Sequence, residues 1–391
     1  MQVNRAYKYE LDLNNVQRTA CLKHAGAARF AFNWGLRRKK EAYAAGEKTP
    51  TAIDLHRELN VLKQSEIPWM YEVSKCAPQE ALRDLDRAFV NFFENRSRFP
   101  RFKSRKQGIG GFRLTGAIRV QGKRAQLPRL GMLRLKEHSD VEGRIVSATV
   151  RERAGRWFVS LCVEQSITVP ENQGPAIGVD LGIEKLATLS DRTVFDNPRA
   201  YRKKLGLLKR AQRTLSRRQK GSRRREWARQ CIATVQYRIA CMRSDAIHKL
   251  TSYLAKTYSQ IGIEDLHVVG MLKNHRLAGA ISDAAFAEVR RQLAYKTIWY
   301  GSEVVVHDRF FPSSKQCSRC GWVKADLVLS ERIFHCAACA YTEDRDVNAA
   351  MNLCPGVPRA LDVDGTALAA GQATAVKPTR LKRQPNLMQN E

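Results

Sequence analysis

Four cysteines in the last quarter of the chain have the types and spacing of a metal site. Cys317 and Cys320 form one Cys-x2-Cys pair, and Cys336 and Cys339 form a second pair after fifteen intervening residues. Two such pairs supply the four thiolates of a closed tetrahedral zinc site. Because a closed site has no open coordination position, we expect a structural zinc. The intervening segment is too short for a core of its own, so metal binding would supply much of its folding energy.

Two disulfides or a redox-active pair are the other interpretations of these cysteines. The N-terminal residues contain no apolar stretch typical of a secretory signal, so we expect a cytosolic protein, where thiols stay reduced. This expectation favours zinc. The other six cysteines show no pairing pattern, and we interpret them as ordinary thiols: Cys21, Cys76, Cys162, Cys231, Cys241 and Cys354.

Three carboxylates each close or follow a short predicted element. Asp180 ends an apolar strand, Glu264 ends a second one, and Asp346 precedes a short helical run. A carboxylate in a buried strand is costly unless it holds a cation or a partner. Two Mg²⁺ ions held about 4 Å apart by such groups would activate water for phosphodiester cleavage. The alternatives are a paired aspartate at a sheet end and, for Asp346, a helix cap.

The charge of the chain indicates a polyanionic partner. Its 391 residues carry a formal net charge of +30, far more than solubility requires, and this favours nucleic acid. The chain contains no run of eighteen apolar residues, so we expect no membrane span. Its length allows two or three domains with a sizeable core.

The most basic segment covers residues 199 to 229, where fourteen lysines and arginines accompany one acid, Glu226. A charge run is usually a solvated helix face, but so many cations would repel one another without phosphates nearby. We expect a helix that breaks at Gly221-Ser222 and resumes to about Lys256. The candidate nucleic-acid contacts here are Arg217, Arg218, Lys220, Arg223 and Arg224.

The first 170 residues show two patterns. Residues 2 to 13 alternate as a strand does, and residues 15 to 46, 53 to 62 and those following Pro78 have helical periodicity. Residues 96 to 170 then form a basic stretch followed by short strand-like runs separated by turn residues. We expect a small antiparallel β-barrel or sandwich, with the helices inserted after its first strand. Near the third helix, Lys75 and Gln79 are spaced i, i+4 and could contact nucleic acid together, although a solvated face is the simpler explanation.

The second half alternates strands and helices after a linker at residues 171 to 174. Short buried strands are predicted at residues 176 to 180, 259 to 266 and 303 to 307, and an amphipathic helix from about Asp283 to Tyr300. With the zinc segment and a final helix, this order fits an RNase H-like α/β sheet. The carboxylates are too far apart in sequence for their spacing to show that they converge.

Several motifs together resemble the TnpB family, the OrfB-type proteins of IS200/IS605 transposons, which are related to type V CRISPR effector nucleases. The matching segments are GVDLGIEKLATLSD (178 to 191), LSRRQKGSRRR (215 to 225), GIEDL (262 to 266), SDAAFAEVRRQLAYKTIWYG (282 to 301), PSSKQCSRCG (312 to 321) and DRDVNAAMN (344 to 352), with GAARFAFNWGL (26 to 36) and FPRFKSR (99 to 105) in the first half. The resemblance extends to about residue 354.

The resemblance implies an RNA-guided, Mg²⁺-dependent DNA endonuclease. Such a protein binds a guide RNA derived from the transposon end, recognises a short motif beside a double-stranded DNA target, and cuts in a RuvC domain. The family's catalytic triad carries over to Asp180, Glu264 and Asp346, which would hold two Mg²⁺ ions. Lys75, Gln79 and Thr115 lie in segments that match the family's nucleic-acid contact regions. We expect a monomer in a bacterial or archaeal cytoplasm, associated with the nucleoid and not with a membrane.

The family also implies the domain boundaries. Residues 1 to 170 would be a wedge-type β-barrel (about 1 to 14 and 97 to 170) with an inserted helical recognition lobe (about 15 to 96). Residues 175 to 354 would form the RuvC-like nuclease domain, with a zinc ribbon inserted at 312 to 343 and a disordered tail at 355 to 391. One departure is Ala340, which follows the last zinc cysteine where the family commonly has glycine.

Two alternative functions are a catalytically silent RNA-guided DNA-binding regulator and a strand-joining transposase. The intact carboxylate triad argues against the regulator. The sequence contains no tyrosine or serine recombinase signature that would support strand transfer.

Overall fold

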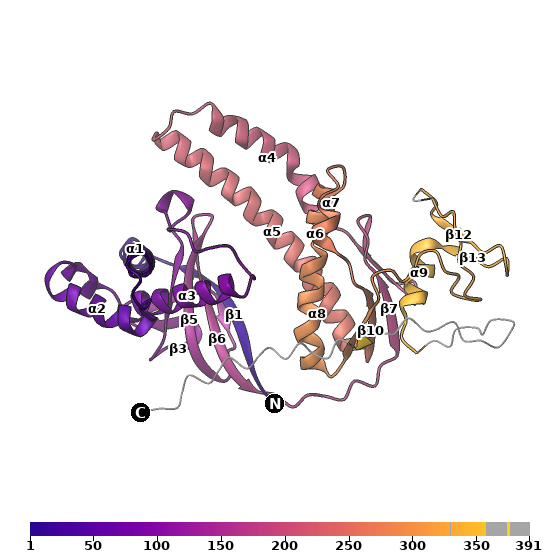
Figure 1. The fold of residues 1–391 in the computed structure, drawn as a ribbon, viewed down its shortest axis with the longest axis horizontal. Coiled ribbons are helices and arrows are strands. Elements are labelled where there is room, and N and C mark those ends of the chain that lie inside the picture. The colour runs from indigo at the N-terminus through magenta and orange to yellow at the C-terminus, as the bar shows by residue number, and fades with distance from the viewer. Residues whose placement is uncertain (329, 357–373, 376–391) are drawn as a thin grey trace. The chain divides into compact units, whose positions relative to one another are not determined.

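The structure is a computed structural model that describes residues 1–328, 330–356 and 374–375. It contains two compact units, Met1–Ile167 and Thr168–Glu391. Figure 1 colours the first unit from indigo to magenta and the second from magenta-pink to yellow. Both units are mixed α and β, as predicted, whereas the finer domain boundaries given above remain predictions.

The first unit contains one six-stranded antiparallel sheet. Its strands are β1 (Gln2–Asp12), β2 (Gly111–Leu114), β3 (Arg119–Leu127), β4 (Gly131–Ser139), β5 (Arg144–Arg153) and β6 (Arg156–Ser166), in the order β2-β5-β6-β1-β4-β3. The first strand lies in the middle, paired with β6 from Gln2↔Ser166 to Leu11↔Trp157.

The predicted β-barrel is thus confirmed in part, as one antiparallel sheet of the described residues. In the described part of the chain the sheet stays open, because β2 and β3 are its edge strands and do not pair with each other. Strand β2 is only four residues long, which leaves few backbone groups to close a barrel.

The helices of this unit follow β1, as predicted. They are α1 (Asn15–Ala44), α2 (Ala52–Ser65) and α3 (Cys76–Phe93), with short 3-10 turns at Pro68–Glu72 and Arg105–Gln107. Asn14 and Thr51 form capping boxes that start the first two helices. Helix α3 begins two residues before Pro78, earlier than predicted, because proline is tolerated in the first turn of a helix, where its missing N–H has no partner to lose.

The second unit is built on a sheet in the order β14-β11-β10-β7-β8-β9. Its strands are β7 (Ala176–Asp180), β8 (Lys185–Leu189), β9 (Val194–Asp196), β10 (Gln260–Glu264), β11 (Glu303–His307) and β14 (Thr374–Ala375). Strands β7, β10 and β11 are parallel, so their carboxyl ends share one edge of the sheet. Asp180, Glu264 and His307 are the last residues of these three strands.

Six helices accompany this sheet in the described residues: α4 (Ala200–Ser216), α5 (Arg223–Thr257), α6 (Val268–Met271), α7 (Ala278–Ala284), α8 (Phe286–Tyr300) and α9 (Arg345–Leu353). Helices α4 and α5 form the long hairpin seen in Figure 1 and pack through Ala200, Leu208, Val235 and Ile239. The predicted break is confirmed, since Ser222 caps α5. Helices α6 and α7 were not predicted, because they are too short to show periodicity.

The last described elements are the cysteine segment and α9. Strands β12 (Ile333–His335) and β13 (Thr342–Asp344) form a small hairpin that leads directly into α9. The tail predicted at 355 to 391 lies outside the described residues, apart from 355–356 and the two residues of β14. Across the described ranges, no helix combines the length and apolarity that crossing a bilayer requires.

Candidate metal centres and nucleic-acid surfaces

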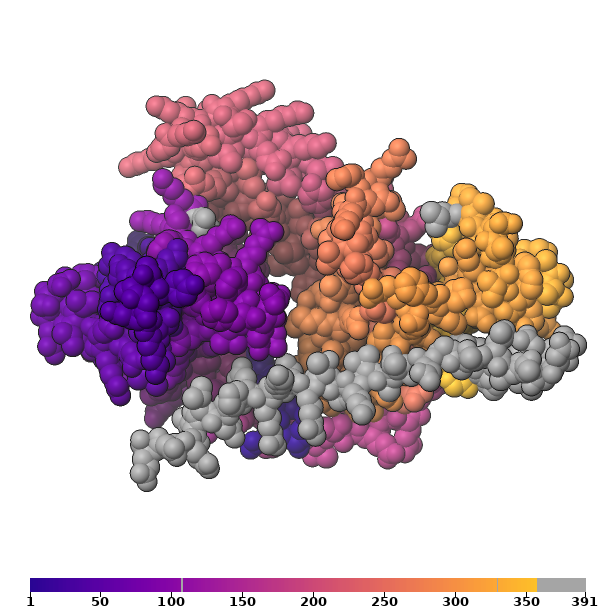
Figure 2. All heavy atoms as spheres, viewed as in Figure 1, coloured from indigo at the N-terminus to yellow at the C-terminus, as the bar shows by residue number. Residues whose placement is uncertain are grey.

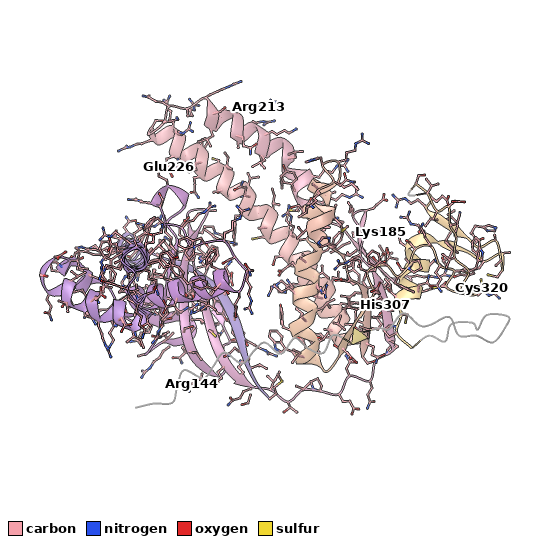
Figure 3. The ribbon with its side chains drawn as sticks, in the orientation of Figure 1. Arg144, Lys185, Arg213, Glu226, His307 and Cys320 are labelled. Carbon is pink, nitrogen blue, oxygen red and sulfur yellow. The ribbon has the colours of Figure 1, made fainter. Side chains whose placement is uncertain are left out.

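The four cysteines of the ribbon converge. Their sulfur atoms all lie within 4.8 Å of one another, with Cys317 Sγ 3.7 Å from Cys339 Sγ and Cys320 Sγ 3.5 Å from Cys336 Sγ. These separations are much longer than a disulfide bond of about 2.05 Å, so the disulfide alternative does not hold. Four thiols gathered in this way suit tetrahedral zinc. Figure 3 labels Cys320 in this ribbon.

Two matching turns shape the cysteine pairs. The Cys317 amide donates to Trp322 O at 2.8 Å, and the Cys336 amide donates to Tyr341 O at 2.9 Å. The residue after each pair has left-handed backbone, with φ of +80° at Gly321 and +55° at Ala340. The departure noted in the sequence therefore places an alanine where glycine is the natural choice.

Burial raises the pKa of the Cys336 thiol, but the Cys339 backbone N–H and the Cys320 thiol outweigh it and lower the pKa to about 7. A thiolate is the form that binds metal. Burial instead raises the pKa of Cys317 and Cys320, so zinc binding here would release protons from thiols.

The carboxylate site begins at the shared edge of β7 and β10. These strands pair in parallel up to Ile263↔Val179, so the next residues, Glu264 and Asp180, are neighbours at the carboxyl ends. Asp346 lies in the first turn of α9. Both Glu264 and Asp346 are half-buried, as is Asp180.

Two glycines let α9 pack directly against β7 and β10. Gly178 and Gly262 are register partners in the middle of β7 and β10. A Cβ atom on Gly178 would lie 1.8 Å from Ala350 O, and one on Gly262 would lie 1.7 Å from Leu353 O. The last turn of α9 therefore lies directly on the backbones of the two strands. This contact was not predicted, although the glycine at the centre of each short strand was a signal for it.

The pKa of Asp180 reflects the nearby carboxylates of Glu264 and Asp346. Burial, and then the negative charges of Glu264 and Asp346, raise the pKa of Asp180 to about 8, and the nearby Arg345 guanidinium only partly opposes them. The three carboxylates are wider apart than the thiols, because among the described residues only the cysteines meet the 4.8 Å spacing. Carboxylates that share two ions about 4 Å apart do not need that spacing.

The acids next to these carboxylates have other partners. Asp344 caps α9 by accepting from the Asp346 amide at 2.9 Å and the Val347 amide at 3.2 Å, so the cap considered for Asp346 belongs to Asp344. Asp265 pairs with Arg309 at 2.5 Å and also with Arg290. Asp346 contacts Arg345, with Nη2 3.3 Å from Oδ1.

Glu264 has one further contact that sequence analysis missed. The hydroxyl of buried Ser313 donates to Glu264 Oε1. Ser313 lies within the PSSK segment before the first zinc cysteine, and nothing in its spacing indicated a role. Figure 3 labels Lys185 and His307 on the sheet of this unit.

In the first unit, two of the three predicted nucleic-acid residues lie together. Lys75 and Thr115 line one surface groove with Lys63 and Arg129, and the Cys76 thiol lies 3.5 Å from Thr115 O. Gln79 lies about one turn further along α3, half-buried, and does not line this groove.

The predicted basic contacts of the second unit gather at the turn between α4 and α5. All five are exposed: Arg217, Arg218, Lys220, Arg223 and Arg224. Arg225 has a structural role instead, because its guanidinium donates to Leu215 O at 2.8 Å and to Arg218 O at 2.7 Å. Figure 2 shows long side chains extending outward from this hairpin, and Figure 3 labels Arg213 and Glu226 on it.

Family models match most of the chain. A model described as OrfB_IS605, probable transposase, matches residues 160–275, and one described as the Cas12f1-like TNB domain matches residues 286–353. A third, described as a helix-turn-helix domain, matches residues 1–48. In this structure those residues form strand β1 and the single helix α1.

Two curated relatives match this chain over most of their length. A Streptomyces pristinaespiralis protein provisionally named an RNA-guided DNA endonuclease is 39% identical over 90% of this chain and 89% of its own. InsQ of Escherichia coli K12, with the same provisional name, is 34% identical over 89% of this chain and 91% of its own. A cryo-EM structure of a Cas12f1-sgRNA-target DNA complex aligns with 90% of this chain and 99% of the Cas12f1 chain, with a TM-score of 0.37 and 14% identity.

A CRISPR-associated endodeoxyribonuclease, Cas12f1 of Sulfoacidibacillus thermotolerans, is 21% identical over 52% of this chain and 50% of its own. The identity to the two bacterial proteins extends over nearly the whole of each chain. This chain therefore belongs to the TnpB/OrfB family of IS605-type elements, which is related to Cas12f1.

Proposed function

We propose that the protein is an RNA-guided DNA endonuclease whose cutting site consists of Asp180, Glu264 and Asp346. The observation that carries the proposal is the meeting of these carboxylates at one sheet edge, where the pKa of Asp180 is raised to about 8. Crowded carboxylates repel one another, and a divalent cation relieves that repulsion. We infer the RNA guide and the DNA target from the names of the bacterial relatives.

The order of elements supports a nuclease of the RNase H-like type. Strands β7, β8 and β9 form consecutive antiparallel pairs, and β10 and β11 then extend the sheet in parallel with β7. Asp180 would contact both Mg²⁺ ions, and Glu264 and Asp346 would each contact one. When bound, the ions would activate the attacking water and stabilise the leaving oxygen.

The protein's own residues fix the geometry of this site. The sheet register places Asp180 beside Glu264, and the close contact of α9 with Gly178 and Gly262 sets the position of Asp346. No side chain of the triad needs to form a covalent bond with the phosphate. The described contacts thus supply orientation, which is the protein's main task in metal-assisted hydrolysis.

Three surfaces are suited to the nucleic acids. The exposed cations of the α4–α5 turn suit phosphates of a folded RNA, and the groove containing Lys75 and Thr115 suits a DNA duplex beside the target. A third surface, on the first unit, combines rings and charge: Phe93 is 73% exposed, and Lys40 Nζ lies 5.4 Å and 5.3 Å from the ring centroids of Phe99 and Phe102. Exposed rings beside cations are typical of single-strand contacts.

The zinc ribbon has a structural role in this proposal. Its four thiols would fill every coordination position of the ion, which leaves none for water or substrate. The ribbon then serves to hold the start of α9, which carries Asp346.

Cleavage in the presence of the native RNA tests the proposal. The protein is co-expressed with its own downstream flanking DNA, purified, and mixed with Mg²⁺ and a plasmid carrying a guide-matched site beside a randomised motif. We expect breaks that depend on the motif and on RNA, and that disappear in Asp180→Asn. Asp196→Asn, at the exposed end of β9, is the matched control and should cut normally.

Two results would contradict the proposal. RNA-dependent binding of the target without breaks would support the silent regulator. Products in which DNA ends are joined would support the strand-joining transposase.

A further inference from the structure

Ser313 contacts two elements of the carboxylate site at once. Its side chain is only 2% exposed, and its hydroxyl donates to Glu264 Oε1 at the end of β10. Its backbone carbonyl accepts from Asn352 Nδ2 of α9 at 2.8 Å. One residue therefore joins the strand that carries Glu264 to the helix that carries Asp346.

The same helix holds the first zinc cysteine from both sides. Gln316 O accepts from Asn352 Nδ2 at 2.6 Å and from Asn348 Nδ2 at 2.7 Å. Asn348 Oδ1 in turn accepts from the Ser318 amide at 2.9 Å, and Asn348 is fully buried. Gln316 and Ser318 flank Cys317, so the backbone around this ligand is fixed to α9.

These contacts form a closed circuit within the second unit. It runs from Glu264 to Ser313, from Ser313 to α9, and from α9 back to β7 and β10 through their two glycines. Because every member is buried or half-buried, a shift of residues 313–318 would change the distance between Glu264 and Asp346. A change in the ribbon would therefore reach the carboxylates.

We propose that Ser313 is a positioning residue of the carboxylate site, and that residues 313–318 couple zinc loading of the ribbon to divalent-metal binding there. The inference rests on the proposed function, since it takes Glu264 and Asp346 as ligands. The hydroxyl restricts the Glu264 carboxylate to one orientation, and the Asn352 contact fixes the hydroxyl relative to α9. Removing hydrogen-bond partners of metal ligands typically weakens metal affinity by roughly 10–100-fold.

The test measures Mn²⁺ binding to the zinc-loaded full chain by electron paramagnetic resonance, which reports affinity and the symmetry of the bound ion without any cleavage. Ser313→Ala is expected to weaken Mn²⁺ binding by roughly 10–100-fold and to change the spectrum of the bound ion. Ser313→Thr, which keeps the hydroxyl, should restore most of the affinity. Ser302→Ala is the matched control. Its Oγ donates to a backbone carbonyl, with 3.1 Å between Ser302 Oγ and Ala255 O, but this bond does not involve the carboxylates.

A second variant tests the connection through α9. Asn352→Ala keeps every zinc cysteine and every carboxylate but removes the contacts to Ser313 O and Gln316 O. We expect one zinc per chain, as in the parent, and a single cooperative unfolding transition. We also expect weaker Mn²⁺ binding. Removing zinc from the parent protein should also weaken Mn²⁺ binding, as Asn352→Ala does.

The possible results separate this inference from the proposed function. Mn²⁺ affinities within twofold of the parent in both Ser313→Ala and Asn352→Ala would overturn the positioning role, and unchanged affinity after zinc removal would overturn the coupling. Glu264→Gln decides the underlying function. If it too leaves Mn²⁺ binding unchanged, the carboxylates are not the metal site and the proposed function fails as well.

Discussion

The two candidate metal centres are assembled in opposite ways. The four thiols come from residues 317–339, where two short turns bring each pair together, and their sulfur atoms already lie within 4.8 Å. The carboxylates come from β7, β10 and α9, and they meet only through sheet register and a close contact between backbones. A site made by local turns can be predicted from spacing, whereas a site made by packing cannot.

The largest expected effect is the loss of zinc from the local centre. Cys336→Ser should release the ion and unfold residues 313–344, because apparent zinc-binding energies in small ribbons reach about 10–16 kcal/mol. Hydrogen exchange would show this as rapid exchange of the Cys317 amide, which otherwise donates to Trp322 O. Amides of β1 and β6 in the first unit serve as the internal control and should stay protected. A ribbon that keeps its protection without zinc would contradict the local origin of this centre.

The next effect concerns the close contact that assembles the carboxylates. Gly262→Ala places a Cβ 1.7 Å from Leu353 O, so α9 must move, and we expect a destabilisation of more than about 4 kcal/mol. Urea unfolding of the second unit measures it. The matched control is Gly206→Ala in α4, where no atom lies within 4 Å, and this change should stabilise by about 0.5–1 kcal/mol. Equal stability of both variants would show that α9 does not depend on this contact.

Another effect follows from the titration of Asp180 in protein that holds zinc but no magnesium. Its pKa is about 8 in the folded state and 3.8 in the reference state. Between these values the folded protein binds more protons than the unfolded chain, so stability falls as pH rises from about 4 to 8, by roughly 1.4 kcal/mol per pH unit.

Asp180→Asn should remove most of this slope and make the magnesium-free protein more stable at pH 8. Unfolding midpoints of both proteins across this range provide the measurement. A parent slope of the opposite sign, or one that survives in the variant, would show that crowding of the carboxylates does not determine the slope.

The smallest effect tests the symmetry of the two zinc turns. Ala340 adopts a φ of +55° where its counterpart Gly321 has +80°. Ala340→Gly should relieve about 1 kcal/mol of backbone strain, which corresponds to roughly fivefold tighter zinc binding. Competition with a zinc chelator would measure it, and Ala338→Gly in the same pair is the control. No gain at position 340 would show that the turn tolerates alanine without strain.

The sequence predicted the features that depend on local pattern. The cysteine spacing, the break at Gly221-Ser222 and the long helices α1 and α5 are all confirmed. Each depends on residues close together in the chain. The parallel pairing that makes Asp180 and Glu264 neighbours depends on register between distant strands, so spacing alone left it open.

The missed features are contacts between distant segments. Nothing around Ser313 indicated that its hydroxyl reaches Glu264, and Asn348 and Asn352 looked like ordinary helix residues. The β-barrel is confirmed only in part, because alternation identifies strands but does not determine whether the two edge strands meet. The family resemblance implies that Asp346 is a metal ligand, and the structure assigns the helix cap to the neighbouring Asp344.

The central place of β1 in the first sheet has a consequence for synthesis on the ribosome. Strand β1 is the first element made, yet it pairs with β6, which begins at residue 156. At about 5–20 residues per second, this partner follows roughly 7–30 s later. Helices α1 to α3 have time to form in that interval, before β1 can pair with β6. A chain that terminates early therefore never completes this sheet, and the basic α4–α5 hairpin is translated only after all six strands exist.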